Sequence, residues 1–331
     1  MPDGVEQLCN LFRTQKPLLL VGAGASARVG YPCWGKLVER LAGKFSPGLP
    51  VGVDALAEVD QIEQIALDSG RREEYWKFLD DAFCAQSRTL GDLRFHRSLI
   101  SLGFAGLATT NYDPTLEQAC DLEYRELNLT RCEEIDLREP DPRYRVFRFL
   151  RSLAVEPHHR YVLHLHGFHR WPARLILGGK SYEAAYGHRH AEPDDTLRTF
   201  HRKVLYAVLA TRPVVFVGFG MADPFFVEVL RLLKRDFVLT DEPAHFAIMP
   251  YEVDAVSTAT EHERRVAHDR EQAVIREKLP NGVQPVFYHA PDGNHDELPG
   301  LIADLASELG RPTPPAQSFM DRFAARGFEE V

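Results

Sequence analysis

The chain has 331 residues, of which 44% are hydrophobic and 26% are charged. This composition is that of a soluble globular protein, and the length suits one large α/β domain with room for an insertion. The formal net charge of −9 argues against a surface devoted to nucleic-acid binding, so we expect no direct contact with nucleic acid.

Five cysteines are spread along the chain without any Cys-x-x-Cys pair. Their odd number and wide spacing argue against a disulfide framework and against a four-cysteine zinc site, so we expect no metal. A reducing cytoplasm is the simplest compartment. The first ten residues carry acids and no long apolar run, and no apolar stretch reaches the ~20 residues that a membrane helix needs. We therefore expect no contact with a membrane.

The first predicted elements are a strand, a helix and a helical block. Residues 17–22 form an apolar run that ends in glycine, which is typical of a buried parallel strand, and residues 35–45 have helical spacing. Three amphipathic helices are predicted next, at residues 54–67, 73–83 and 92–102. We expect them to form a helical insertion at about residues 50–102.

Strands and helices alternate in the rest of the chain. Strands are predicted at residues 104–109, 161–165, 214–217, 246–249 and 286–288, with helices at 197–209, 225–234, 261–278 and 297–309. The polar residues 124–148, which include Pro140 and Pro142, are predicted to form a loop or small insertion. The alternation predicts an α/β fold with a doubly wound, Rossmann-like parallel sheet. We assign residues 1–310 to one domain and 311–331 to a C-terminal tail.

A glycine-rich turn joins the first strand to its helix. Residues 21–27 read VGAGASA and satisfy G-x-G-x-x-G/A through Gly22, Gly24 and Ala27. Such glycines let backbone N–H groups approach a pyrophosphate closely, and the Ser26 hydroxyl adds a donor. We therefore expect Gly22, Ala23, Gly24 and Ser26 to hold phosphates, and a tight turn without a ligand is the alternative.

Two other nucleotide-binding patterns are incomplete. A dehydrogenase usually carries an acid about 20 residues after the turn, at the end of the second strand, to hold a ribose. Here Glu39 falls inside a predicted helix, which disfavours a dehydrogenase. The run GGKS at residues 178–181 resembles the tail of a P-loop. We reject a P-loop because Arg174 stands where the leading glycine is needed.

Asn111 follows the strand at residues 104–109, within the run ATTNYDP of residues 108–114. Ligands bind at the carboxyl ends of the strands of doubly wound sheets. An amide there can hold a ribose hydroxyl or a water, and Thr110 precedes it. Asp113 is explained more simply as a helix cap before Pro114.

Histidines close the strand at residues 161–165, in the run HLHGFH of residues 164–169. Because side chains alternate along a strand, we expect His164 and His166 to share one face. Zinc binding by the pair and a purely structural histidine are alternatives, and no acid or cysteine stands at a spacing that supports zinc. Gly167 allows the backbone to open toward a ligand, so we prefer His166 to His164 as the functional residue.

The strand at residues 214–217 also ends in glycines. Gly218, Phe219 and Gly220 predict a close approach of the backbone to a ligand. Asp223 precedes Pro224, so capping explains it at least as well as chemistry does. We expect these strand ends to converge on one crevice with the glycine turn.

Taken in order, these motifs resemble the sirtuin-like family, and specifically its bacterial, defence-associated NAD-hydrolase branch. The turn followed by GYPCW at residues 30–34 resembles that branch's nucleotide loop, and TTNYD at 109–113 resembles the sirtuin T-Q-N-x-D motif. His166 and Gly167 resemble the catalytic H-G pair. GFGMADP at 218–224 resembles G-x-S-x-x-D-P, with Gly220, followed by Met221, where serine is more usual.

Two features depart from the deacetylating sirtuins that the family also contains. Their loop reads G-I-P-D-F-R, whereas residues 30–35 read GYPCWG here. They carry a four-cysteine zinc module after the histidine, and no cysteine stands between His166 and Val214 in this chain. The missing module disfavours deacetylation and leaves NAD cleavage possible.

The resemblance implies that NAD⁺ is the substrate and that no metal is needed. The chain would hydrolyse the nicotinamide–ribose bond to nicotinamide and ADP-ribose, as an effector that depletes NAD in anti-phage defence. Asn111 would hold the ribose and the attacking water, and His166 would act as general base with a pKa near ~6.5. Asp113 would contact the carboxamide or ribose. Tyr31 and Trp34 would wall the nicotinamide pocket, with core packing an equal alternative.

Unregulated NAD cleavage would poison the cell that makes the protein. By family analogy we expect a homo-oligomer, or a separate activating partner such as a ring ATPase or an Argonaute-like sensor. Three other functions remain open at this point. They are a non-catalytic module that binds NAD or ADP-ribose, a sirtuin-type deacylase or ADP-ribosyltransferase, and a dehydrogenase.

Overall fold

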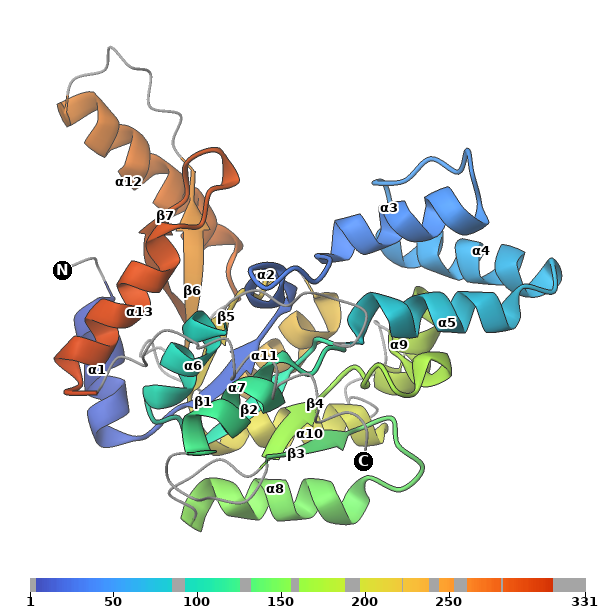
Figure 1. Cartoon of the computed structure of the whole chain (residues 1–331). Helices are drawn as coiled ribbons and strands as arrows, with labels where there is room; N and C mark the ends of the chain where they lie inside the picture. The colour runs from blue at the N-terminus through green and yellow to red at the C-terminus, as the bar shows by residue number, and fades with distance from the viewer. Residues whose placement is uncertain are drawn as a thin grey trace.

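A sheet of seven parallel strands forms the centre of the molecule (Figure 1). The computed structural model describes residues 4–84, 93–125, 132–155, 161–187, 197–221, 223–237, 244–252, 261–280 and 282–311. The strand order is β3-β4-β2-β1-β5-β6-β7. The strands are β1 (Leu18–Val21), β2 (Gly106–Thr109), β3 (Glu133–Asp136), β4 (Tyr161–His164), β5 (Val214–Val217), β6 (His245–Tyr251) and β7 (Val283–His289). The predicted doubly wound parallel sheet is confirmed.

The order of the strands reverses between β1 and β5. From β1 the chain adds β2 and β4 on one side and later returns to place β5 on the other. These four strands are buried along their whole length, which explains their nearly continuous apolar sequences. Ligands bind at such a reversal, outside the carboxyl ends of the strands, so the fold itself favours a site above β1 and β5.

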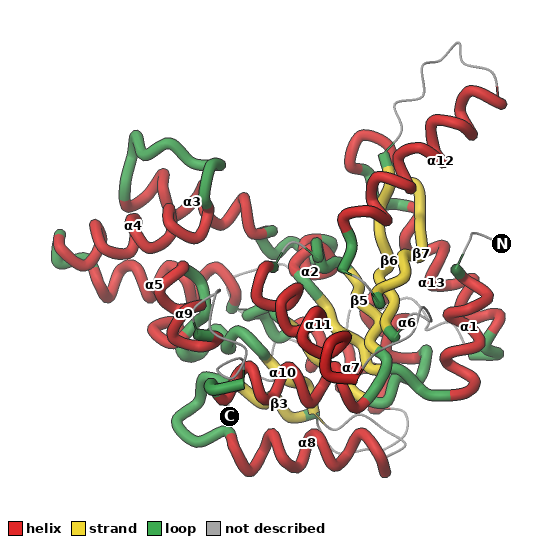
Figure 2. The backbone as a smooth tube through the Cα atoms, turned by 180° about the vertical axis from the view of Figure 1, so that it is seen from behind, coloured by secondary structure: helices red, strands yellow, loops and turns green. Residues whose placement is uncertain are grey.

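Helices cover both faces of the sheet. The apolar side chains of one core come from the sheet and from α1 (Val5–Thr14), α6 (Arg94–Ser101), α7 (Thr115–Arg125) and α13 (Glu297–Glu308). On the other face the core contains α8 (Arg143–Val155), α9 (Gly179–Tyr186), α10 (Phe200–Thr211) and α11 (Pro224–Phe237), and Figure 2 shows α10 and α11 in front of the strands. α12 (Glu261–Lys278) lies against β6 and β7 and extends away from the body of the molecule (Figure 1).

A third core lies beyond the carboxyl ends of the strands, in what we call the helical lobe. It consists of α3 (Trp34–Phe45), α4 (Ala55–Asp68) and α5 (Arg72–Phe83), which pack on one another (Figure 1). The structure differs from the expected insertion at residues 50–102. α3 joins the lobe, whereas α6 leaves it because Phe95, Leu99 and Ile100 pack in the core of the sheet.

The polar segment at residues 124–148 contains more structure than its sequence predicts. β3 is an edge strand with its first two residues at least partly exposed, so its sequence EEID shows no apolar run. α8 begins directly after Pro142 and buries Val146, Phe149 and Leu153. The prediction of a loop is therefore wrong for these residues. The helices α1 and α9 were also not predicted, and residues 312–331 of the expected tail lie outside the described residues.

Short elements complete the fold. α2 (Ala23–Ala27) directly follows β1, and two single-turn helices, η2 (Pro172–Arg174) and η4 (Pro291–Gly293), lie in loops. In the part of the chain that the structure describes, no helix has the length and apolar composition needed to cross a membrane.

Candidate active site

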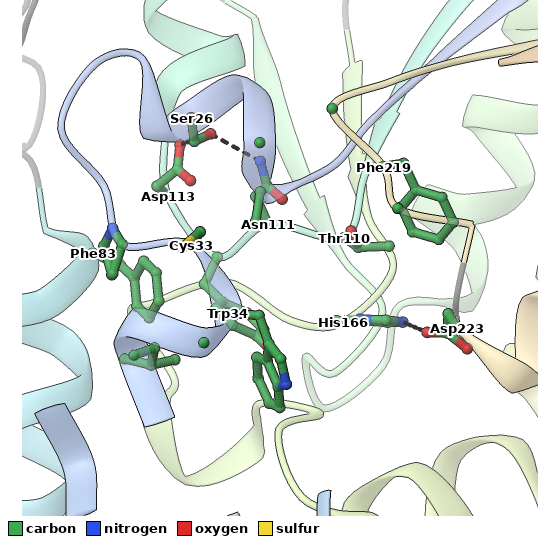
Figure 3. Close-up of a pocket in the computed structure, with 18 of the residues that line it drawn as sticks. Ser26, Cys33, Trp34, Phe83, Thr110, Asn111, Asp113, His166, Phe219 and Asp223 are labelled. Carbon is green, nitrogen blue, oxygen red and sulfur yellow. Dashed lines mark hydrogen bonds and ion pairs between the residues drawn. The ribbon is translucent and has the colours of Figure 1, made fainter. Parts of the chain in front are cut away.

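A cavity of about 540 Å³ opens where the ends of β1, β2, β4 and β5 meet the helical lobe (Figure 3). The expected convergence of strand ends on one crevice is confirmed. All but two of the predicted site residues line this cavity: Ala23, Gly24, Ser26, Trp34, Thr110, Asn111, Asp113, His166, Gly218, Phe219, Gly220 and Asp223. Such a volume lies within the range of roughly 300–1,000 Å³ that small-molecule sites have in proteins.

Tyr31 is one of the two exceptions. Its side chain is 3% exposed and packs in the core of the helical lobe, where its ring stacks on that of Phe83 at 6.4 Å. The prediction that Tyr31 walls the pocket is therefore wrong, and its alternative of core packing is confirmed. Trp34, by contrast, does line the cavity.

Gly22 is the other exception, and packing explains why it is a glycine. A Cβ there would lie 2.5 Å from the carbonyl oxygen of Gly218 and 2.7 Å from the Cα of Phe219. The amides of Gly22 and Gly24 donate to the carbonyls of Val217 (2.9 Å) and Gly218 (3.0 Å). The two turns after β1 and β5 are thus joined backbone to backbone, and these amides do not point outward as the phosphate interpretation predicts.

Asn111, Ser26 and Asp113 form one hydrogen-bonded chain at the cavity wall (Figure 3). The single hydroxyl proton of Ser26 is donated to Asp113 Oδ1 at 3.2 Å, so Ser26 must accept from Asn111 Nδ2, 2.8 Å away. Ser26 therefore orients the amide of Asn111 instead of offering a proton to a phosphate. The amide oxygen of Asn111 is left as the atom that can accept a hydrogen bond from a ligand or a water.

Asp113 serves the start of α7 as well. Its Oδ1 accepts from the backbone amide of Thr115 at 3.1 Å and from the Thr115 hydroxyl. The side chain is buried, at 4% exposed. The capping interpretation of Asp113 is thus supported, and the same carboxylate fixes Ser26 and, through it, Asn111.

His164 lies on the face of the sheet that α7 covers. Its Nε2 is 2.7 Å from Glu117 Oε1 and its Nδ1 is 2.8 Å from the backbone oxygen of Asn111. Burial opposes a charge on this ring, but the Glu117 carboxylate and these hydrogen bonds outweigh it and raise the pKa of His164 to about 9. A doubly protonated His164 donates to both partners and holds the backbone of Asn111 in place.

His166 lies on the opposite face, so the expectation that the two histidines share a face is wrong. β4 ends at His164, the chain then bends, and Gly167 adopts a φ of +99°. The ring of His166 packs against Tyr182 and Tyr186 of α9, with centroids at 5.1 and 5.8 Å. Strand alternation no longer applies beyond the last hydrogen-bonded residue of the strand.

The ring of His166 is buried, at 3% exposed, and it lines the cavity. Its Nε2 has no hydrogen-bond partner among the described residues and lies 4.0 Å from Asp223 Oδ2. Burial, together with the nearby ring of His201, lowers the pKa of His166 to about 3. The expected pKa near 6.5 is therefore wrong, and His166 is a neutral ring that offers a hydrogen-bonding nitrogen at neutral pH.

Asp223 has two roles, one for each carboxylate oxygen. Its Oδ1 accepts from the amides of Phe225 (2.9 Å) and Phe226 (3.2 Å) and so caps α11, as the sequence predicts. Its Oδ2 faces the cavity wall and accepts from the hydroxyl of Tyr182 at 3.1 Å. Helix capping and a place in the site are therefore compatible for this residue.

Several cavity residues have no counterpart in the sequence motifs. The most polar is Tyr182 of α9, and the others include Leu56 and Phe83 of the helical lobe. The run GGKS begins α9, where Ser181 Oγ accepts from the amides of Leu177 and Gly178. The rejection of a P-loop is supported, since this serine caps a helix.

No sequence pattern around Tyr182 predicts its contact with Asp223, because the two residues lie 41 positions apart. Elsewhere, all five cysteines are free thiols. Within the described ranges, no group of three or more His, Cys, Asp or Glu residues is arranged to hold a metal ion.

Comparison with known proteins agrees with this geometry. The sequence profile of the SIR2-like domain matches residues 105–275, just over half of the 331 residues. Defense-associated sirtuin 2 of Bacillus subtilis is 22% identical over 249 residues, which cover 72% of this chain and 22% of that protein. NAD(+) hydrolase ThsA of Bacillus cereus (strain MSX-D12) is 25% identical over 240 residues, which cover 71% of this chain and 43% of that protein.

The matched region spans less than half the length of either relative. Both relatives are distant in sequence, and the similarity to each covers about seven-tenths of this chain, 72% and 71%. The order of the motifs, the parallel sheet whose strand order reverses between β1 and β5, and the matching profile agree with one another. The chain belongs to the family of SIR2-like domains.

Proposed function

We propose that the cavity binds NAD⁺ and that the chain hydrolyses its nicotinamide–ribose bond, giving nicotinamide and ADP-ribose. The observation that carries this proposal is the placement of two side chains. Asn111 and His166 line the same cavity beside the turn that contains Gly24, and Nε2 of His166 has no hydrogen-bond partner among the described residues (Figure 3). The name of one relative, NAD(+) hydrolase ThsA, supports the same chemistry.

The cavity suits a dinucleotide in two respects. Trp34, Phe83 and Phe219 give it aromatic walls against which flat rings can pack. Ala23 and Gly24 border it at the end of β1, which is where doubly wound folds hold the phosphates of a nucleotide. We assign the phosphates to this border, with Thr110, Gly218 and Gly220 as neighbours.

The reaction asks little acid catalysis of the protein, because the nicotinamide nitrogen is cationic when bound to ribose and becomes neutral as the bond breaks. Asn111 holds the ribose and, through its amide oxygen, a water on the opposite side of the breaking bond. His166 Nε2 accepts the proton that this water loses as it bonds to the ribose carbon. The electrons of the broken bond stay on nicotinamide, and one proton is released to solvent.

A neutral His166 is the form that this role requires. Because burial lowers its pKa to about 3, the acceptor form dominates at neutral pH. The nearby carboxylate of Asp223, 4.0 Å from Nε2, opposes the cost of a proton that arrives there during the reaction. We expect no inflection near pH 6.5 in the rate profile from this residue.

The test is product analysis by mass after incubation with NAD⁺. Wild-type protein should release nicotinamide and ADP-ribose, and Asn111→Ala and His166→Ala should each abolish the release while circular dichroism shows an intact fold. Matched controls are Asn10→Ala and His262→Ala, which change exposed residues outside the cavity and should keep full activity. Full activity in both site variants would rule out the assignment.

We further propose that the chain acts in anti-phage defence by depleting NAD, as the name of its relative Defense-associated sirtuin 2 suggests. Constant NAD cleavage would harm the host, so the activity needs restraint. We propose that a homo-oligomer or a separate activating partner, of the ring-ATPase or Argonaute-like kind, supplies it. Sizing of the purified chain alongside its NAD turnover tests this, and a monomer with constant full activity would contradict it.

A further inference from the structure

The side chain of Tyr182 lies between the two polar groups on the His166 side of the cavity. Its hydroxyl oxygen is 3.1 Å from Asp223 Oδ2 and 3.4 Å from His166 Nδ1. Its ring stacks on Phe225 with centroids 5.2 Å apart and meets the ring of His166 edge-on at 5.1 Å. These aromatic contacts hold the phenol in one orientation between the acid and the histidine.

The single proton of this hydroxyl decides the direction of both hydrogen bonds. An ionised carboxylate only accepts, so Tyr182 donates its proton to Asp223. Burial and the Asp223 carboxylate raise the pKa of Tyr182 well above its ordinary value, so the proton stays on the phenol. Toward His166 the phenol oxygen can therefore only accept, which requires a hydrogen on Nδ1.

A neutral imidazole carries one hydrogen on its two nitrogens, so a hydrogen on Nδ1 leaves Nε2 with a lone pair. We propose that Tyr182, together with Asp223, is a positioning residue that fixes this tautomer of His166 and presents Nε2 to the cavity as a hydrogen-bond acceptor. Figure 3 shows His166 and Asp223 side by side at the cavity wall. For the role of this acceptor in catalysis, the inference rests on the proposed NAD hydrolysis.

The hydroxyl also suppresses the competing tautomer. Asp223 Oδ2 lies 4.0 Å from Nε2, close enough to attract a hydrogen placed there after a small shift. Tyr182 already donates a hydrogen bond to that oxygen, which weakens its attraction for a hydrogen on Nε2. Without the hydroxyl, Nδ1 loses its acceptor partner and Asp223 favours a hydrogen on Nε2, which could no longer accept a proton from water.

The variant Tyr182→Phe removes only the hydroxyl. We measure the ¹⁵N shifts of the His166 ring by NMR, which distinguish a protonated nitrogen from one with a lone pair. Wild type should show the lone pair on Nε2, and Tyr182→Phe should shift the hydrogen toward Nε2. The kcat for NAD⁺ should fall by about 10- to 100-fold, the usual effect of losing a group that orients a functional histidine, with little change in KM.

The matched control is Tyr186→Phe. Tyr186 also packs its ring on His166, at 5.8 Å, but its hydroxyl bonds to neither His166 nor Asp223 in the described structure. This variant should keep the wild-type ¹⁵N pattern and the wild-type kcat. Equal thermal melting of both variants excludes a folding defect as the cause of any difference.

The outcomes separate this inference from the proposed function. A hydrogen on Nε2 in wild type, or an unchanged ring pattern in Tyr182→Phe, overturns the positioning role whether or not NAD⁺ is cleaved. If Tyr182→Phe moves the hydrogen but wild type does not cleave NAD⁺, the positioning role stands and the proposed function fails. If the wild-type protein cleaves NAD⁺ and Tyr182→Phe has the same kcat, the inference is also overturned.

Discussion

Two regions on either side of the end of β4 contain a buried histidine each, and they treat it in opposite ways. On the α7 side, both nitrogens of His164 are hydrogen-bonded, one to Glu117 and one to the backbone of Asn111. On the α9 side, Nε2 of His166 has no hydrogen-bond partner among the described residues. Their pKa values accordingly move apart, to about 9 and about 3.

Burial alone therefore does not mark a functional histidine. Buried polar atoms in proteins are nearly always hydrogen-bonded, so an unused nitrogen on a cavity wall calls for an explanation, and a ligand is one. The bonded histidine stabilises the fold and holds the backbone from which Asn111 projects. The other contributes a nitrogen that the fold leaves unused.

The largest expected contrast is in activity. His166→Gln should lower NAD⁺ turnover by about 10²–10⁴-fold, the usual contribution of a proton acceptor in catalysis. Its free energy of unfolding should stay close to that of wild type. Steady-state kinetics and urea unfolding of the same sample measure both, and a variant that is inactive only because it is unfolded would break the comparison.

The next contrast is in stability. His164→Leu leaves the buried Glu117 without its partner 2.7 Å away, which should cost about 3–5 kcal/mol of the free energy of unfolding. His166→Leu removes a nitrogen without a hydrogen-bond partner and one long hydrogen bond, from Nδ1 to Tyr182, whose hydroxyl keeps Asp223 as a partner, so it should cost about 1 kcal/mol at most. Urea unfolding at pH 7 compares the two, and equal losses would mean that the histidines do not differ as described.

The response to pH sharpens the same contrast. The folded pKa of His166 lies below its unfolded value near ~6.5, so its contribution falls as pH drops from 6.5 toward 3, by up to about 1.4 kcal/mol per pH unit. The folded pKa of His164 lies above that value, so its contribution is complete below pH 6.5 and is lost as pH rises toward 9. Each Leu variant should remove one of these two slopes, as unfolding at pH 5, 7 and 9 would reveal.

The smallest expected effect concerns the backbone contact between the turns that follow β1 and β5. Gly22→Ala places a methyl group 2.5 Å from the Gly218 carbonyl and should displace the loop that carries Asp223, at about 1–3 kcal/mol. Gly43→Ala is the control, because Gly43 lies in α3, an added Cβ there would meet no atom within 4 Å, and the change should stabilise by about 0.5–1 kcal/mol. A harmless Gly22→Ala would show that the two turns are not tightly joined.

The sequence predicts the sheet well because its central strands are short, apolar and flanked by helices of clear period. Their ends bear Asn111 and His166, and the rule that ligands bind there predicts the place of the site. The edge strand β3 was not predicted, because its partly exposed residues are polar and break the apolar pattern. Tyr31 is misassigned because adjacency to the glycine turn says nothing about which way its ring points.

Contacts between distant segments lie beyond sequence patterns. Tyr182 reaches Asp223 only when α9 packs beside α11. Ser26 donates its hydroxyl proton to Asp113, which lies 87 positions away in the sequence. The pKa of His166 depends on burial by tyrosines of α9, so a free-histidine value near ~6.5 is the only one that a sequence can suggest.

The first turn of α9 has one further consequence. Asp60 of α4 accepts a hydrogen bond from the Lys180 amide at 3.0 Å, and a side chain at Gly178 would collide with this carboxylate. The helix that bears Tyr182 is thereby anchored to α4 of the helical lobe. The orientation of the phenol at the cavity wall therefore depends on a carboxylate of the helical lobe that lies outside the cavity lining.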